Sequence, residues 1–187
     1  MSSPGRGRPR ASSREELADA ATELFLERGY AATAIADITR RAGVSRASFF
    51  NYFASKSALL WDVFDCRVEA LEAGLAGPDG SLERGLDAFA NGESPAVLAL
   101  AIVDARTMGL EEELSQSRAE RQLRIAAALE AQLRRDGETP VRAAARGGGY
   151  AAALLAAVWG WADRGAGRHD LAAAIRDAIG EARELLG

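Results

Sequence analysis

The sequence predicts an all-α protein of about nine helices, and three observations lead to that prediction. Ala, Leu, Glu and Arg, which favour helices, dominate the 187 residues. The alternating runs of Val, Ile, Thr and aromatic residues that are typical of strands do not occur. Apolar residues recur instead at intervals of three and four, between helix start and stop signals. We therefore expect helices throughout the chain and no sheet.

The first expected helix runs from Ser13 to Gly29. Ser13 and Glu16 have the spacing of a capping box, and Gly29 is placed like the glycine that follows many helices. Residues 1–11, ahead of this helix, read as a flexible basic arm. The arm holds Arg6, Arg8 and Arg10.

Two short helices with a sharp turn between them come next. Thr33 is a natural N-cap for one, and Ser45 caps the other, which runs to about Tyr52. Gly43 lies between them and can adopt the positive φ that such a turn requires. The second helix is polar at its front and aromatic behind, which suits a helix that enters the major groove. An ordinary helical hairpin also fits the turn alone.

The rest of the chain predicts six further helices. The first begins after the N-cap Ser55 and carries an apolar stripe, and the other five read as 81–91, 95–107, 110–135, 140–162 and 170–186. We divide the chain into a helix-turn-helix head over residues 12–56 and a helical body over residues 57–187.

Charge separates these two parts. The net charge is −4 overall, but residues 1–56 carry +3 and residues 57–187 carry −7. A basic head on an acidic body favours phosphate binding by the head. Fluctuation of surface charge is the alternative.

Composition also excludes several classes of protein. One cysteine, Cys66, and one histidine, His169, exclude a disulfide framework and leave no catalytic, metal or cofactor constellation. No apolar run is long enough to cross a membrane. We therefore expect a cytoplasmic protein that is not an enzyme, with Cys66 as a small apolar filler.

Four motifs follow one another within residues 13–60, namely Phe25-x-x-x-Gly29-Tyr30, Thr33-x-x-x-Asp37-Ile38, Ala42-Gly43-Val44-Ser45 and Phe49-x-x-Tyr52-Phe53-x-x-Lys56-x-x-Leu59. With these motifs the segment resembles the TetR family of bacterial transcriptional repressors. The resemblance implies a ligand-responsive regulator, expected to be a repressor, that binds a palindromic operator in double-stranded DNA as a homodimer. A non-sequence-specific architectural DNA-binding protein is the rival interpretation.

The DNA-binding residues follow from the turn, from the arm and from this resemblance. Arg46 can donate to guanine O6 and N7, and the arm sequence Arg-Gly-Arg-Pro-Arg resembles a minor-groove AT-hook, with a merely solvated tail as the alternative. Two positions depart from the family pattern, Ala36 and Phe50, where arginine and tyrosine are common. Phe49 and Phe53 are assigned to the core. The expected DNA contacts are Arg6, Arg8, Arg10, Thr33, Ser45, Arg46, Ala47, Ser48, Phe50, Asn51, Tyr52 and Lys56.

The resemblance gives the body two tasks, holding a small effector and pairing with a second copy. Candidate pocket residues are Trp61, Phe64, Phe89, Ile102, Met108, Ile125, Tyr150, Leu154 and Trp159, each with an ordinary core role as the alternative. Candidate dimer contacts, with packing inside one monomer as the alternative, are Ala152, Leu155, Leu171, Ile175, Ile179 and Leu186. The effector is expected to be small and apolar or amphipathic.

Two features of the body leave alternatives open. A faint similarity to relatives that sense acyl-CoA thioesters involves Arg118, Arg121 and Arg124, which also fit a solvated face. Gly147, Gly148 and Gly149 lie inside an expected helix and mark either a kink or the opening of a pocket.

Overall fold

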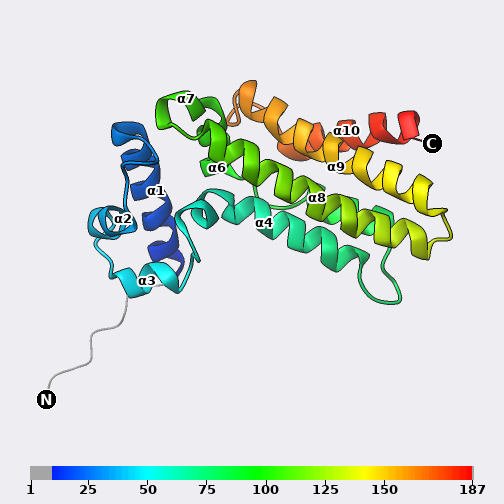
Figure 1. Ribbon diagram of the computed structural model, residues 1–187, viewed down its shortest axis with the longest axis horizontal. Helices are drawn as coiled ribbons and strands as arrows, with labels where there is room; N and C mark the ends of the chain where they lie inside the picture. The colour runs from blue at the N-terminus through cyan, green and yellow to red at the C-terminus, as the bar shows by residue number, and fades with distance from the viewer. Residues whose placement is uncertain (1–9, 187) are drawn as a thin grey trace, which may run out of the picture.

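The computed structural model describes residues 10–186, and these form helices without any strand (Figure 1). The all-α prediction is therefore confirmed. The ten helices are α1 (Arg10–Arg28), α2 (Ile35–Arg41), α3 (Arg46–Phe50), α4 (Lys56–Leu75), α5 (Leu82–Ala90), α6 (Ala96–Val103), α7 (Ala105–Met108), α8 (Glu111–Arg135), α9 (Pro140–Asp163) and α10 (Leu171–Leu186).

The helices form a small head and a longer body. Helices α1, α2 and α3 gather at one end, and α4 leads from this head into the body (Figure 1). In the body, α8 packs against both α4 and α9, and α10 packs against α9. Helix α7 packs against α1, so the head also touches the body away from α4.

The start of α1 differs from the expected start. The helix begins at Arg10, so the capping box predicted at Ser13 is wrong. Ser13 lies within the first turns of α1 and is 8% exposed. Arg10 and Ala11, which the sequence assigns to the arm, belong to this helix. The apolar stripe of α1 is as expected, because Leu17 and Phe25 are fully buried.

Two serines predicted to cap helices of the body do so in the structure. The hydroxyl of Ser55 accepts a hydrogen bond of 3.0 Å from the N–H of Ala58 at the start of α4. The hydroxyl of Ser81 accepts a bond of 3.2 Å from the N–H of Arg84 at the start of α5. Each cap satisfies an N–H group that has no partner inside its helix.

The helix expected over 95–107 is divided, which raises the number of helices from nine to ten. Asp104, with φ −100° and ψ 20°, separates α6 from α7. Helix α7 is only four residues long and stops at Gly109, whose φ is +64°. Glycine reaches this left-handed conformation at little cost, which explains the sharp stop.

The glycine triplet lies within an unbroken α9, and Gly147 has a packing role. A Cβ atom added to Gly147 would lie 2.8 Å from the carbonyl oxygen of Ala126 and 2.9 Å from the backbone nitrogen of Glu130. The backbones of α9 and α8 therefore approach each other at this point more closely than any side chain allows. Nothing lies within 4 Å of the same position at Gly148.

One arginine is buried in the body without a carboxylate partner among the described residues. Arg67 of α4 is 1% exposed, and burial lowers its pKa to about 10. Its guanidinium donates to the carbonyl oxygens at the end of α5 and in the loop that follows, which belong to Phe89, Ala90, Gly92 and Glu93. Arg67 therefore acts as a C-terminal cap for α5, supplied by another helix.

Candidate nucleic-acid interface

The turn between α2 and α3 has the geometry that the sequence predicts. Gly43 has a φ of +67°, and the N–H of Val44 donates to the carbonyl oxygen of Thr39 at 3.0 Å. Ser45 is the N-cap of α3, where its hydroxyl accepts from the N–H of Ser48 at 3.0 Å. The short helix α3 therefore begins at a fixed point, directly after a sharp reversal of the chain.

The front of α3 is exposed, while its rear is buried. Arg46 and Ala47 are exposed, and Ser48 is half-buried. Phe49 is fully buried and Phe53 is 2% exposed, so their assignment to the core is confirmed. The buried aromatic residues anchor α3 on the head, and the polar front remains free to contact a partner.

Three further candidates lie toward the end of α3. Phe50 is 47% exposed, and the guanidinium carbon of Arg46 lies 5.6 Å from the centre of its ring. Asn51 is exposed at the C-cap of the helix, and Tyr52 is half-buried. An exposed phenylalanine beside an arginine forms a surface that is both apolar and cationic, which suits a thymine methyl group next to a guanine.

Thr33 has a different role from the expected one. The N-cap of α2 is Ala34, and its N–H is bonded at 3.1 Å by the carboxylate of Asp37. Thr33 is 2% exposed, and its hydroxyl donates to the carbonyl oxygen of Gly29 at 2.9 Å. The prediction that Thr33 caps α2 is therefore wrong. This inward hydroxyl also gives no support to the predicted phosphate contact.

The ammonium group of Lys56 is engaged within the head. It donates to the carbonyl oxygens of Tyr30 and Thr33, the second at 2.8 Å, and lies 3.9 Å from the centre of the Tyr30 ring. Burial lowers its pKa. Lys56 holds the loop between α1 and α2 with two of its three N–H donors, which leaves one N–H for the predicted phosphate contact.

The two arginines of α2 differ in their ion pairs and in their exposure, and the sequence alone does not distinguish them. Arg41 is bonded to Glu23 and Glu27 of α1, each at 2.8 Å. The side chain of Arg40 is 70% exposed, and its one ion pair within residues 10–186 is with Asp37, its neighbour on α2. Arg40 is thus a candidate DNA contact beside the turn that sequence reasoning missed.

The arginines of the arm lie at the limit of the structure. Arg6 and Arg8 are outside the described residues, and Arg10 is the first residue of α1. The minor-groove contact predicted for them stays a prediction.

Most of the candidate pocket residues belong to the packed core of the body. Seven of the nine are no more than 1% exposed, namely Trp61, Phe64, Phe89, Met108, Ile125, Tyr150 and Leu154. Ile102 and Trp159 are half-buried and line a cleft of about 300 Å³ between α6, α7, α8 and α9. The structure therefore supports the core role for the seven and an open site only around these two.

The candidate dimer residues are mostly used inside the chain. Leu155, Leu171, Ile175 and Ile179 are at most 7% exposed, because the apolar stripe of α10 packs onto α9. As contacts to a second copy these four are corrected to core residues. Ala152 is exposed and Leu186 is half-buried.

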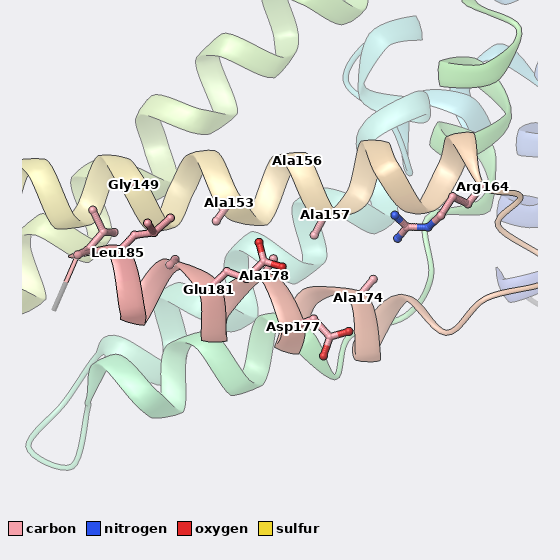
Figure 2. A pocket seen from close by; sticks show the side chains of 12 residues that line it. Gly149, Ala153, Ala156, Ala157, Arg164, Ala174, Asp177, Ala178, Glu181 and Leu185 are labelled. Atoms are coloured by element: carbon pink, nitrogen blue, oxygen red, sulfur yellow. The ribbon is translucent and has the colours of Figure 1, made fainter.

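A different face of α9 and α10 remains open. Figure 2 shows the two helices side by side, with small side chains such as Ala153, Ala156 and Ala178 along the groove of about 550 Å³ between them. Leu185, at the end of this groove, is 84% exposed. The sequence shows the small residues of this face, but it does not show which side of each helix is covered by other helices of the same chain.

Three further features of the described residues concern metal ligands, membrane-spanning helices and the single cysteine. Their side chains form no group of three or more His, Cys, Asp and Glu residues that could hold a metal ion. In the same part of the chain, no helix is long and apolar enough to cross a bilayer. Cys66 is exposed, so its expected role as a small apolar filler is wrong.

Known proteins are similar to this chain over the segment that forms the helix-turn-helix. The model of the tetR family of bacterial regulatory proteins matches residues 17–63, which include the whole of α2, the turn and α3. The solved structure of the dihydroxyacetone kinase operon activator DhaS covers 93% of this chain and 96% of its own, with a TM-score of 0.55. At 14% identity, that likeness concerns the fold alone.

Two curated relatives are similar over part of their length. The HTH-type transcriptional repressor DhaR of Mycobacterium sp. (strain GP1) is 49% identical over 45 residues, or 24% of this chain and 23% of DhaR. The HTH-type transcriptional repressor Rv3405c of Mycobacterium tuberculosis is 38% identical over 102 residues, or 51% of this chain and 52% of that protein. The chain thus spans from a quarter to a half of the length of these relatives. The capped, glycine-turned α3 lies inside the matched segment, so residues 17–63 form a head similar to that of the tetR family of bacterial regulatory proteins.

Proposed function

We propose that the protein is a transcriptional regulator that binds a palindromic operator as a homodimer and releases it when a small effector binds the body. The observation that carries the proposal is the exposed front of α3, where Arg46 follows the Ser45 cap. A helix presented in this way places its first side chains against base edges in the major groove. The protein acts in the cytoplasm and is not an enzyme.

A second copy of the chain supplies the second recognition helix that a palindromic operator requires. Two recognition helices reach successive major grooves when they lie about 34 to 36 Å apart, which requires a twofold assembly. The open groove of α9 and α10 supports such an assembly, because the small side chains that line it allow close helix packing. Arg164 lines this groove together with Asp177 and Glu181, so residues of opposite charge are available to pair with those of a second copy.

The direction of regulation follows the names of two relatives, which are repressors. An activator is the second candidate, because another relative, FasR of Mycolicibacterium smegmatis, which is 39% identical over 67 residues, is named an activator. In either case, a coupling between effector and DNA of about 1–3 kcal/mol would change operator affinity by about 5–150-fold.

Binding of labelled duplexes tests the proposal. Fluorescence anisotropy at a fixed salt concentration compares DNA from the region upstream of the gene with a shuffled duplex of equal composition. We expect the specificity ratio to exceed about 10³, and Arg46→Ala to lower specific affinity by about 5–150-fold for each half-site. Arg106→Ala, which removes an exposed arginine of α7, is the matched control.

Equal affinity for the two duplexes would favour the architectural rival, which needs only the basic head and arm. Unchanged specific binding by Arg46→Ala would overturn α3 as the recognition helix. A transcription assay with and without bound protein then separates repression from activation.

A further inference from the structure

Three arginines lie along α8 at intervals of three residues, and their partners differ. Arg121 forms two hydrogen bonds of 2.7 and 2.6 Å with the carboxylate of Asp65. Arg124 forms two bonds of the same lengths with Glu72. Arg118 forms no ion pair with any carboxylate of the described residues. Its guanidinium carbon lies 4.3 Å from the centre of the Trp159 ring. Arg118 is therefore a half-buried cation whose fork of donors lacks an anion.

Arg118 and Trp159 line the cleft of about 300 Å³ that opens between α6, α7, α8 and α9. Ile102 and Leu114 supply apolar wall. Glu111 also lines the cleft, and it is exposed at the start of α8. A cation set in an apolar wall is suited to an anion that carries an apolar group.

A second donor without a partner lies behind Trp159. The ring of Trp61 is 6.0 Å from that of Trp159, and Trp61 is fully buried. Its indole N–H has no hydrogen-bond acceptor among the described residues. A buried donor that finds no acceptor is destabilising, so a ligand oxygen that reached it would gain affinity. The cleft itself therefore presents one donor group, Arg118, and the N–H of Trp61 lies beyond the cleft wall, next to the Trp159 ring.

We propose that this cleft binds the carboxylate of a small apolar acid through Arg118, with the indole N–H of Trp61 as the second donor once Trp159 turns aside. The inference rests on the proposed function, because it names the chemical class of the effector. A cleft of about 300 Å³ lies at the lower end of small-molecule sites. This size favours a short aliphatic or aromatic acid over an acyl-CoA thioester.

The cleft is connected to the head through α7. Ala105 of α7 lines the cleft, and the carbonyl oxygen of Met108, at the other end of α7, accepts a hydrogen bond of 2.6 Å from the N–H of Tyr30. Tyr30 lies in the loop between α1 and α2, which Lys56 also holds. A ligand that shifts the four-residue α7 therefore shifts the loop that orients α2 and α3.

Calorimetric titration of the full chain tests the site. The probes are hexanoate, octanoate and benzoate, each compared with its uncharged amide. We expect at least one acid to bind about tenfold or more tightly than its amide, because a charged hydrogen bond is lost in the amide. The proposal is overturned if no acid binds, or if acid and amide bind equally.

Variants assign the binding to particular side chains. Arg118→Gln should weaken binding of the acid by about tenfold, and Arg118→Lys should restore part of it, since lysine keeps the charge but loses the fork. Glu111→Gln should tighten binding, because it removes a like charge. Arg134→Gln, which removes an exposed arginine at the far end of α8, is the control and should bind as the unmodified chain does. Wild-type binding by Arg118→Gln would overturn the site.

Hydrogen exchange of the backbone tests the link to the head. The acid should change the exchange rate of the Tyr30 amide in the unmodified chain and leave it unchanged in Arg118→Gln. Operator binding without any probe is measured in parallel. If the chain binds operator but no acid, this inference fails and the proposed function stands. If it binds the acid but no operator, the proposed function fails and the cleft remains a carboxylate site.

Discussion

The predicted site residues of the head and of the body differ in their exposure to solvent. On the head, the residues predicted to contact DNA at the front of α3 lie at the surface, where Arg46, Ala47 and Asn51 are exposed. In the body, the residues predicted to bind an effector or a second copy are mostly buried, as Trp61 and Ile175 are. Exposure is thus compatible with the predicted role at the front of α3, although Thr33 of the head is buried, and it is incompatible with the predicted role for most candidates of the body.

The difference shows how each site is built. The recognition helix is set by local chemistry, since one glycine, one serine cap and two buried aromatic residues suffice to present its front. A pocket or an interface in an all-helical body depends on which side of each amphipathic helix the neighbouring helices cover. An apolar residue has the same pattern in a core, a pocket or an interface, so only packing separates these roles.

The largest effect is expected from a variant that breaks the assembly without touching the head. Ala156→Arg places a long cation in the small-residue groove of α9 and α10. We expect the protein to sediment as a monomer and specific operator affinity to fall about 100-fold or more, because one half-site no longer supports the other. Ala119→Arg, at an exposed alanine of α8, is the control. A dimeric Ala156→Arg protein would place the interface elsewhere.

A second variant tests whether the body depends on its buried cation. Arg67→Met removes four hydrogen bonds to backbone carbonyls, and of these four carbonyls only that of Phe89 keeps an N–H donor among the described residues, the N–H of Gly92 at 3.5 Å. We expect the free energy of unfolding to fall by about 3 kcal/mol, as measured in urea. The control is Arg84→Met, which removes one exposed bond of 2.9 Å to the carbonyl oxygen of Asp79 and should cost less than about 0.5 kcal/mol. Equal effects of the two variants would contradict a special role for Arg67.

A third pair of variants separates two neighbouring glycines of α9. Gly147→Ala should lower stability by about 1–3 kcal/mol, because its methyl group meets the backbone of α8. Gly148→Ala has open space and should raise stability by about 0.5–1 kcal/mol, since alanine favours a helix. Thermal unfolding measures both. If Gly147→Ala were the more stable of the two, α8 and α9 could not approach as closely as they do here.

What the sequence could predict depended on how local each signal was. Ser45, Ser55 and Ser81 cap helices as expected, because a cap involves only the next three residues. Thr33 also carries a hydroxyl group, but this hydroxyl donates to the carbonyl oxygen of Gly29, because the fold of the α1–α2 loop buries Thr33. The Ser13 capping box failed for a related reason, because helix α1 continues upstream of it.

The links that join head to body lay beyond sequence reasoning altogether. The N–H of Tyr30 meets the carbonyl of Met108, 78 residues further along the chain. A backbone contact of this kind leaves no pattern in the residue types. The pairing of Arg121 with Asp65 spans 56 residues, and nothing in the spacing of charges distinguishes it from the unpaired Arg118. Both features require the arrangement of helices in space.

Tyr30 belongs to the head but is held by the body, so its ionisation reports on the junction between them. Burial, followed by the negative charge of Glu113, raises the pKa of its phenol from the ordinary value of 10.0 to about 12. The native state therefore keeps a proton that the unfolded chain releases above pH 10. The stability that this phenol contributes is fully present below pH 10 and is lost as the pH rises through about 12. Tyrosinate absorbance should show a late phase near pH 12 that disappears in Tyr30→Phe. Ionisation of every tyrosine near pH 10, with the helical circular dichroism intact, would mean that the body does not enclose Tyr30.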